Sequence, residues 1–199
     1  DSVFAEARSG NPSGSPTVVS ASAGLQMDVG TYNDSGTYRI LRSVMRFEIP
    51  ENLVQLSGYP KLKVFPFATN MTASIIATSH AGVLDAAFTA DPMWETNVKA
   101  DDWGQTVFQA VQYGGSSALY STATGPLTKD AYNAITLNQL AAYHCLTVGS
   151  NARYIMIALM NATYDYGGST PGSSVSTTYG DSYTSIRGQG HANEPLLVL

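Results

Sequence analysis

Three histidines and one cysteine are the side chains of this sequence best suited to catalysis. His80, His144 and His191 lie far apart, and none has another histidine or a cysteine two to four residues away. The sequence also contains no H-E-x-x-H, C-x-x-C or G-x-S-x-G motif and no phosphate-binding loop. Cys145 is the single cysteine and lies among apolar residues, so it predicts a packing role. These residues therefore predict that the chain is not an enzyme.

A carboxylate beside a glycine-rich loop is the strongest candidate for a metal ligand. Asp165 lies in the run Tyr-Asp-Tyr-Gly-Gly, which follows a strongly apolar segment. A carboxylate with loop carbonyl groups suits Ca²⁺, which takes several oxygen ligands, and Asp28 and Asp34 are further candidates. The alternative is that Asp165 caps a turn through its own backbone. We favour this alternative, because a single carboxylate is a poor calcium signature, and structural Ca²⁺ remains a hypothesis.

Aromatic side chains are the candidates for contact with a ligand or partner. Aromatic rings suit the apolar faces of sugar rings, with Asn and Gln available for the hydroxyl groups. The candidate ligand-binding residues are Trp94, Trp103, Tyr164, Tyr166 and Tyr183. The alternative for both tryptophans is closure of the hydrophobic core, which we favour. The tyrosines near the loop at 167–174 are better candidates, because loops carry function.

Composition excludes several classes of function. The chain has 199 residues, of which 44% are hydrophobic, enough for one domain over residues 1–199 with a sizeable core. The net charge is -5 and the 10 Lys and Arg residues are scattered, so nucleic-acid binding is not expected. No apolar run approaches the roughly 18 residues needed to span a bilayer.

Short runs of strand type, separated by turn residues, predict the elements that position these side chains. Residues 44–49 alternate between apolar and charged, which is typical of a half-buried antiparallel strand. Residues 154–160 are apolar throughout and fit a central strand. Further strands are predicted at 17–20, 25–29, 62–67, 74–78, 106–113, 134–137 and 196–199. This spacing predicts an all-β antiparallel sandwich of jelly-roll type.

Helix formers after a Thr-Leu-Asn start signal predict one short helix near 138–145, with a second helical turn possible near 127–131. The alternation of the strands also predicts which side chains fill the core. These are Met45, Phe47, Ile49, Leu62, Val64, Ile155, Ile157, Leu159, Leu196 and Val198.

The order of these segments resembles the DNRLRE-type β-sandwich domains, which are similar to carbohydrate-binding jelly-roll modules on bacterial and phage surface proteins. The resemblance covers nearly the whole chain. The run 39–50, Arg-Ile-Leu-Arg-Ser-Val-Met-Arg-Phe-Glu-Ile-Pro, is similar to the family's "R…LLRFDLP" strand. The other segments that carry it are 1–6, 59–65, the tryptophans at 94 and 103, 133–137, 154–159 and 194–199.

Two functions from different classes follow. The first is a non-catalytic structural or adhesive surface module, a subunit of a virion (decoration or fibre) or of another extracellular assembly with protein partners. The second, favoured by the resemblance, is a carbohydrate-binding module of a polysaccharide-degrading enzyme. Both place the protein on a virion surface, on a cell surface or outside the cell. We prefer the first, because no aromatic platform can be assigned from the sequence.

Overall fold

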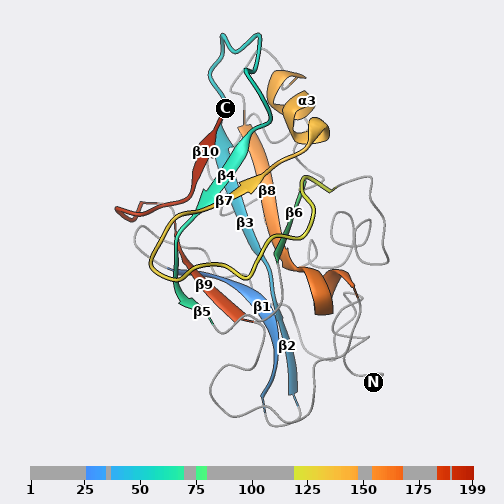
Figure 1. The fold of residues 1–199 in the computed structure, drawn as a ribbon, viewed down its shortest axis with the longest axis vertical. Coiled ribbons are helices and arrows are strands. Elements are labelled where there is room, and N and C mark those ends of the chain that lie inside the picture. Colours follow the sequence, from blue (N-terminus) through green and yellow to red (C-terminus); the bar gives the residue numbers. More distant parts are fainter. Residues whose placement is uncertain are drawn as a thin grey trace.

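The computed structural model describes residues 26–34, 37–69, 75–79, 119–147, 154–167, 183–188 and 190–199, and the description below concerns these residues. They form antiparallel strands with few helices, as Figure 1 shows, which confirms the predicted all-β class. The strands are β1 Gln26–Asp34, β2 Thr37–Leu41, β3 Ser43–Glu48, β4 Lys61–Val64, β5 Pro66–Thr69, β6 Ile75–Ser79, β7 Asn133–Thr136, β8 Tyr154–Asn161, β9 Tyr183–Arg187 and β10 Leu196–Val198. The helices are α3 Gln139–Thr147 and the π-helical turn η5 Ala162–Tyr166.

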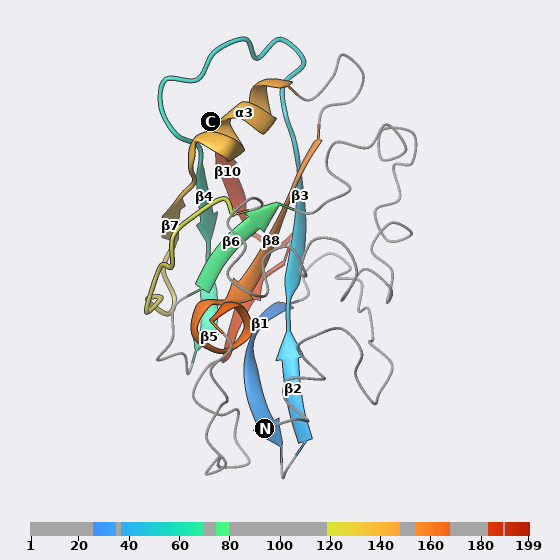
Figure 2. The ribbon, with the colours of Figure 1, turned by 90° about the vertical axis from the view of Figure 1, so that its right-hand side faces the viewer.

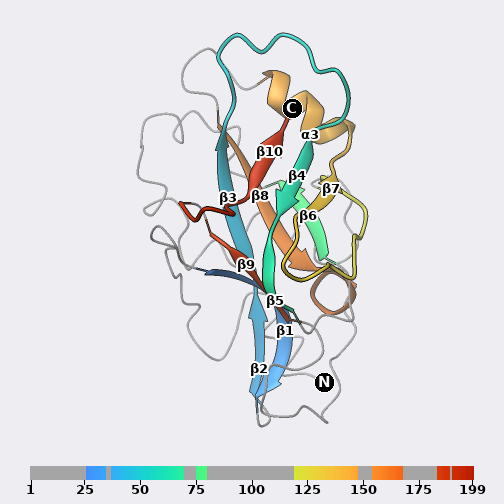
Figure 3. The same ribbon diagram turned by 60° about the vertical axis from the view of Figure 1, so that its left-hand side comes forward.

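The described strands pair into three antiparallel sheets, with the orders β2-β1-β9-β5, β10-β4-β7 and β3-β8-β6. Figure 3 shows β10, β4 and β7 in front, with β3, β8 and β6 behind them. The inward side chains of these two sheets belong to one buried cluster. Leu62 of β4 and Ile135 of β7 lie in it together with Met45, Phe47 and Ile157 of the sheet behind. The hydrophobic core therefore lies between the sheets.

The alternation in β3 and the apolar run in β8 lead to the predicted burial of these two strands. Along β3, buried residues alternate with half-buried or exposed ones. Strand β8 lies between β3 and β6 and is covered on both faces. Ile155, Ile157 and Leu159 face the main core, whereas Ala158 and Met160 belong to a second buried cluster. A strand buried on both faces is apolar along its length instead of alternating between apolar and polar residues, which explains the sequence of β8.

Strands β2 and β3 follow one another along the long axis of the molecule, as Figure 2 shows. A single residue, Arg42, separates them in the sequence. Because β2 pairs with β1 and β3 pairs with β8, the chain passes from one sheet to another at this residue. Arg42 thus marks the junction between two sheets.

The predicted burial of β10 is wrong. Leu196 is 41% exposed and Val198 is 42% exposed. The segment 196–199 is apolar at every position, so the sequence does not show which side chains face inward. Pairing with β4 decides it: Leu197 lies opposite the buried Leu62, whereas Leu196 and Val198 lie opposite the two lysines of β4.

Other predicted elements are close to the observed ones. The predicted strand at 62–67 is two strands, β4 and β5, in different sheets. The predicted helix at 138–145 is confirmed as α3, and Asn138 precedes it, with its Oδ1 accepting the Ala141 N–H at 3.2 Å. Residues 127–131 form a turn rather than a helix, with Asp130 at a φ of 57°. The strands predicted at 17–20 and 106–113 lie outside the described residues.

Candidate functional site

The segment that follows β8 is held by a side-chain cap. Asn161 is fully buried, and its Oδ1 accepts the backbone N–H groups of Thr163 at 2.9 Å and Tyr164 at 2.8 Å. These bonds satisfy donors that a helix start leaves unpaired, and so fix the start of η5. At the other end, a Cβ on Gly167 would lie 2.6 Å from the Thr163 carbonyl oxygen, so glycine is required there for space. The turn is therefore fixed at both ends.

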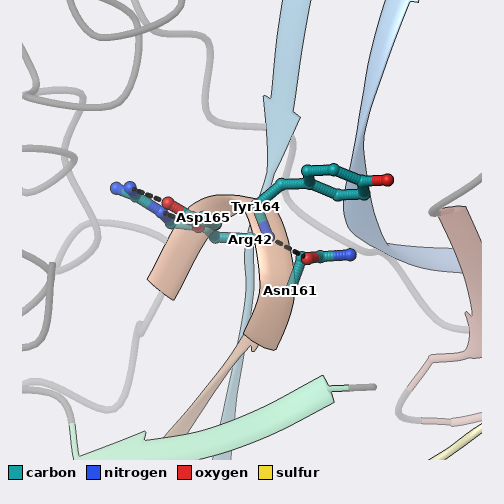
Figure 4. A network of polar contacts seen from close by, with 4 residues as sticks. All are labelled: Arg42, Asn161, Tyr164 and Asp165. Carbon is teal, nitrogen blue, oxygen red and sulfur yellow. Dashed lines mark hydrogen bonds and ion pairs between the residues drawn. The ribbon is translucent and has the colours of Figure 1, made fainter. Parts of the chain in front are cut away.

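Asp165 lies on this turn and forms an ion pair with Arg42 at the β2–β3 junction (Figure 4). The Arg42 Nε donates to Oδ2 and a terminal guanidinium nitrogen donates to Oδ1, both at 2.7 Å. The two side chains are 1% and 0% exposed. A bidentate pair of this kind combines charge with fixed geometry, so it connects the strand junction to the end of β8.

The ion pair with Arg42 affects whether Asp165 is available to bind calcium. Both carboxylate oxygens of Asp165 contact a guanidinium, so a metal ion would have to displace a cation already in place. Asp28 lies in the middle of β1, where its Oδ2 accepts from Gln26 Nε2 at 3.1 Å and its Oδ1 is buried with no hydrogen-bond partner. Within the described ranges, no group of three or more His, Cys, Asp or Glu residues could hold a metal ion.

Of the predicted aromatic residues, the structure describes the side chains of Tyr164 and Tyr166 alone. Tyr164 and Tyr166 are both half-buried on η5, and Tyr166 packs against the second buried cluster. Tyr183 begins β9 and pairs with Gly30 of β1. Trp94 and Trp103 lie outside the described residues.

The histidine and cysteine of α3 lie inside the protein. His144 Nδ1 and the Tyr120 hydroxyl are 2.6 Å apart, and the Tyr120 side chain is fully buried. Burial lowers the pKa of His144, because the charged imidazolium is poorly solvated there. The adjacent Cys145 is also fully buried, and burial raises the pKa of its thiol to about 11. The thiol is therefore protonated at neutral pH, in agreement with the predicted packing role.

A different surface stands out on the sheet β10-β4-β7. Its side chains that point away from the core are exposed or half-buried, and register brings them into neighbouring positions. We call this set the outer face: Leu196 and Val198 of β10, Lys61 and Lys63 of β4, and Ala134 and Thr136 of β7. Figure 3 shows this sheet from the side away from β3 and β8. The face thus places two aliphatic side chains beside two lysines.

An aromatic side chain borders the outer face. Tyr132 directly precedes β7 and is 41% exposed. Its ring packs edge-on against Phe65, with the ring centroids 5.4 Å apart. Its hydroxyl donates to the Glu194 carbonyl oxygen at 3.1 Å. These two contacts connect the start of β7 to the residues that follow β4 and precede β10.

The lysines of the outer face are not neutralised from within the described part of the chain. The ion pairs of Arg42 with Asp165 and of Lys129 with Asp130 involve neither Lys61 nor Lys63. The whole chain carries a net charge of -5. The outer face is therefore a basic and partly apolar surface on an acidic protein.

This surface was not predicted from the sequence, although part of its signal is present there. The Lys-Leu-Lys-Val pattern of β4 places both lysines on one side of a strand. Their neighbours across the sheet depend on long-range pairing between residues 61–64 and 196–198, which no local pattern shows. Comparisons with known protein families, with curated proteins and with solved structures gave no match.

Proposed function

We propose that this protein is a non-catalytic structural subunit of a surface assembly, such as a virion decoration, a fibre or another extracellular structure. It attaches to neighbouring proteins through the outer face. The observation that carries this proposal is the pair of exposed aliphatic side chains at an edge strand, Leu196 at 41% and Val198 at 42%. Exposed apolar groups at an unpaired sheet edge favour contact with another protein.

The fold is part of the same proposal. We propose that the described sheets belong to a jelly-roll sandwich similar to the DNRLRE-type domains. The shared core of the sheets β10-β4-β7 and β3-β8-β6 supports a two-layer arrangement. Such folds serve many functions, so the fold alone selects none, and the surface must carry the assignment.

A carbohydrate-binding module is the alternative function. Tyr132 favours it, because an exposed ring at the border of a sheet face that carries two lysines suits a sugar ring with an acidic group. We prefer protein assembly for one reason. The side chains next to the lysines on β10 are aliphatic, and aliphatic groups lack the flat faces that stack on sugars.

One experiment separates these functions. The full chain is offered a library of random peptides displayed on phage and, in parallel, a glycan array. The double variant Leu196→Ser/Val198→Ser is tested beside it, after circular dichroism confirms an unchanged fold. Both substituted positions are exposed, so folding should tolerate the change.

The proposal expects peptides that bind the natural chain and not the double variant, and no retained glycan. Recovery of no peptide, together with saturable binding of one polysaccharide that Tyr132→Ala abolishes, would establish the alternative. Turnover of any arrayed glycan would overturn both non-catalytic functions.

A further inference from the structure

We infer that the outer face takes an extended, acidic segment of a partner protein, which adds as a fourth strand to the free edge of β10. This inference rests on the proposed function and specifies the chemistry of the partner. Three features carry it: the edge of β10, the apolar side chains on that strand and the spacing of the lysines beside it.

The edge of β10 is open to a further strand. Among the described residues, β10 pairs with β4 on one side alone, and Figure 1 shows it at the margin of the ribbon. Edge strands are commonly blunted by a charged side chain, by a proline or by being very short. Leu196–Val198 is short, with three residues, but it contains neither a charge nor a proline. Its unpaired backbone groups can therefore bind an extended peptide by strand addition.

The two lysines give this edge a charge preference. Lys61 and Lys63 lie two residues apart on β4, so their Cα atoms are roughly 6.6–6.8 Å apart along the strand. An extended partner strand places the side chains of residues i and i+2 at the same spacing and on one face. Carboxylates at such positions lie beside Leu196 and Val198, within reach of the long lysine side chains. Charge complementarity thus favours an acidic strand.

Two other occupants fit less well. A second copy of this chain would offer its own β10, and the segment Pro-Leu-Leu-Val-Leu at 195–199 has no acidic side chain for the lysines. An anionic polysaccharide would meet the lysines but lacks the alternating N–H and C=O groups that an open strand edge can pair. An acidic peptide strand satisfies both requirements.

The test uses short synthetic peptides and the full chain, with binding measured by fluorescence anisotropy. The probe peptide alternates glutamate with valine. The first control peptide has lysine in place of glutamate, and the second carries N-methyl groups along one edge, which removes its hydrogen-bond donors there. Because β10 has three residues, the expected binding is weak for one copy, and multiple copies in an assembly would strengthen it.

A matched pair of variants tests the charge. Lys61→Glu reverses a charge on the outer face, and Lys129→Glu reverses an exposed charge in the turn before β7, where the Lys129 side chain is 57% exposed. We expect Lys61→Glu to weaken binding of the glutamate peptide about tenfold and Lys129→Glu to change it less than about twofold. High salt should reduce the difference between the two variants. Circular dichroism checks that both variants fold.

The inference is overturned if the lysine or the N-methylated peptide binds as well as the glutamate peptide. It is also overturned if the chain binds polygalacturonate and no peptide, or if light scattering shows that self-association occupies the face instead. If library peptides bind at Leu196 and Val198 but lack acidic alternation, the inference fails while the proposed function stands. If no library peptide binds there, both fail.

Discussion

Basic side chains occupy two contrasting places in this protein. Arg42, at the junction of β2 and β3, is buried and holds both oxygens of Asp165. Lys61 and Lys63, on the outer face, have neither burial of that degree nor an ion pair within the described residues. The Arg42–Asp165 ion pair connects elements of the fold to one another. The two lysines leave positive charge directed outward, where a partner can neutralise it.

The difference shows how to assign roles to charges in a chain with few of them. Only 13% of the residues are charged, so each basic side chain is a considerable share of the total. A buried charge without a partner is costly, so a buried pair is explained by the fold itself. An exposed lysine beside exposed aliphatic groups has no such internal explanation, and this is why we place function on the outer face.

The largest expected effect is at the buried pair. Arg42→Met should lower the free energy of unfolding by about 3–5 kcal/mol, because the Asp165 carboxylate would remain buried without its cation. Chemical denaturation measures the loss. The double variant Arg42→Met/Asp165→Leu should recover a substantial part of it. A single variant as stable as the natural chain would show that the pair does not hold the junction.

The next largest effect on stability is expected on the inward side of β4, in comparison with its outward side. Leu62 is fully buried, whereas its neighbour Lys61 is exposed. Leu62→Ala should cost about 2–5 kcal/mol of stability through lost burial and a cavity, and Lys61→Ala less than about 0.5 kcal/mol. Thermal unfolding of both variants checks this. Equal losses would contradict the assignment of inner and outer sides.

A smaller effect on the stability of the protein is expected when the pH is lowered. The pKa of His144 is lowered from 6.5 by burial, so the unfolded chain binds a proton at a higher pH than the folded chain does. The stability contributed by neutral His144 is present above about pH 6.5 and is lost as the pH falls from there through the lower folded pKa. Denaturation across this range should show the decline. In His144→Gln the decline should be smaller, and an unchanged pH profile would contradict the assignment.

The smallest effect on stability is expected on the outer face. Leu196→Ser/Val198→Ser should change the free energy of unfolding by less than about 0.5 kcal/mol for each exposed site, yet abolish binding of the library peptides that contact these two side chains. Chemical denaturation and anisotropy, measured on the same preparation, separate the two effects. A large loss of stability would show that β10 belongs to the core, as the sequence alone had suggested.

Local patterns predicted burial where a strand alternates between apolar and charged residues or is buried on both faces. The alternation of β3 and the uniform apolar run of β8 both indicated their burial correctly. The orientation of β10 was wrong, because a strand that is apolar at every position does not encode which side faces inward. Strand β9 was not predicted, since Tyr-Thr-Ser-Ile-Arg has a mixed pattern that pairing with β1 and β5 resolves.

The candidate site was harder to predict than the fold. Asp165 was considered as a calcium ligand or, preferably, as a turn cap, because its partner Arg42 lies 123 residues away and no local signal joins them. The outer face likewise depends on three strands from distant parts of the sequence. The alternating lysines of β4 were visible, yet without β10 beside them they would be an ordinary solvent-exposed strand face.

The buried cap at Asn161 has a practical consequence for producing the protein. Asn161-Ala162-Thr163 matches the acceptor pattern for N-linked glycosylation. In the folded protein, Asn161 is fully buried and its side chain holds the start of η5. A eukaryotic secretory host that glycosylates this asparagine before folding would attach a bulky sugar to a side chain that has no room for it. Expression in a host without this modification avoids that misfolded product.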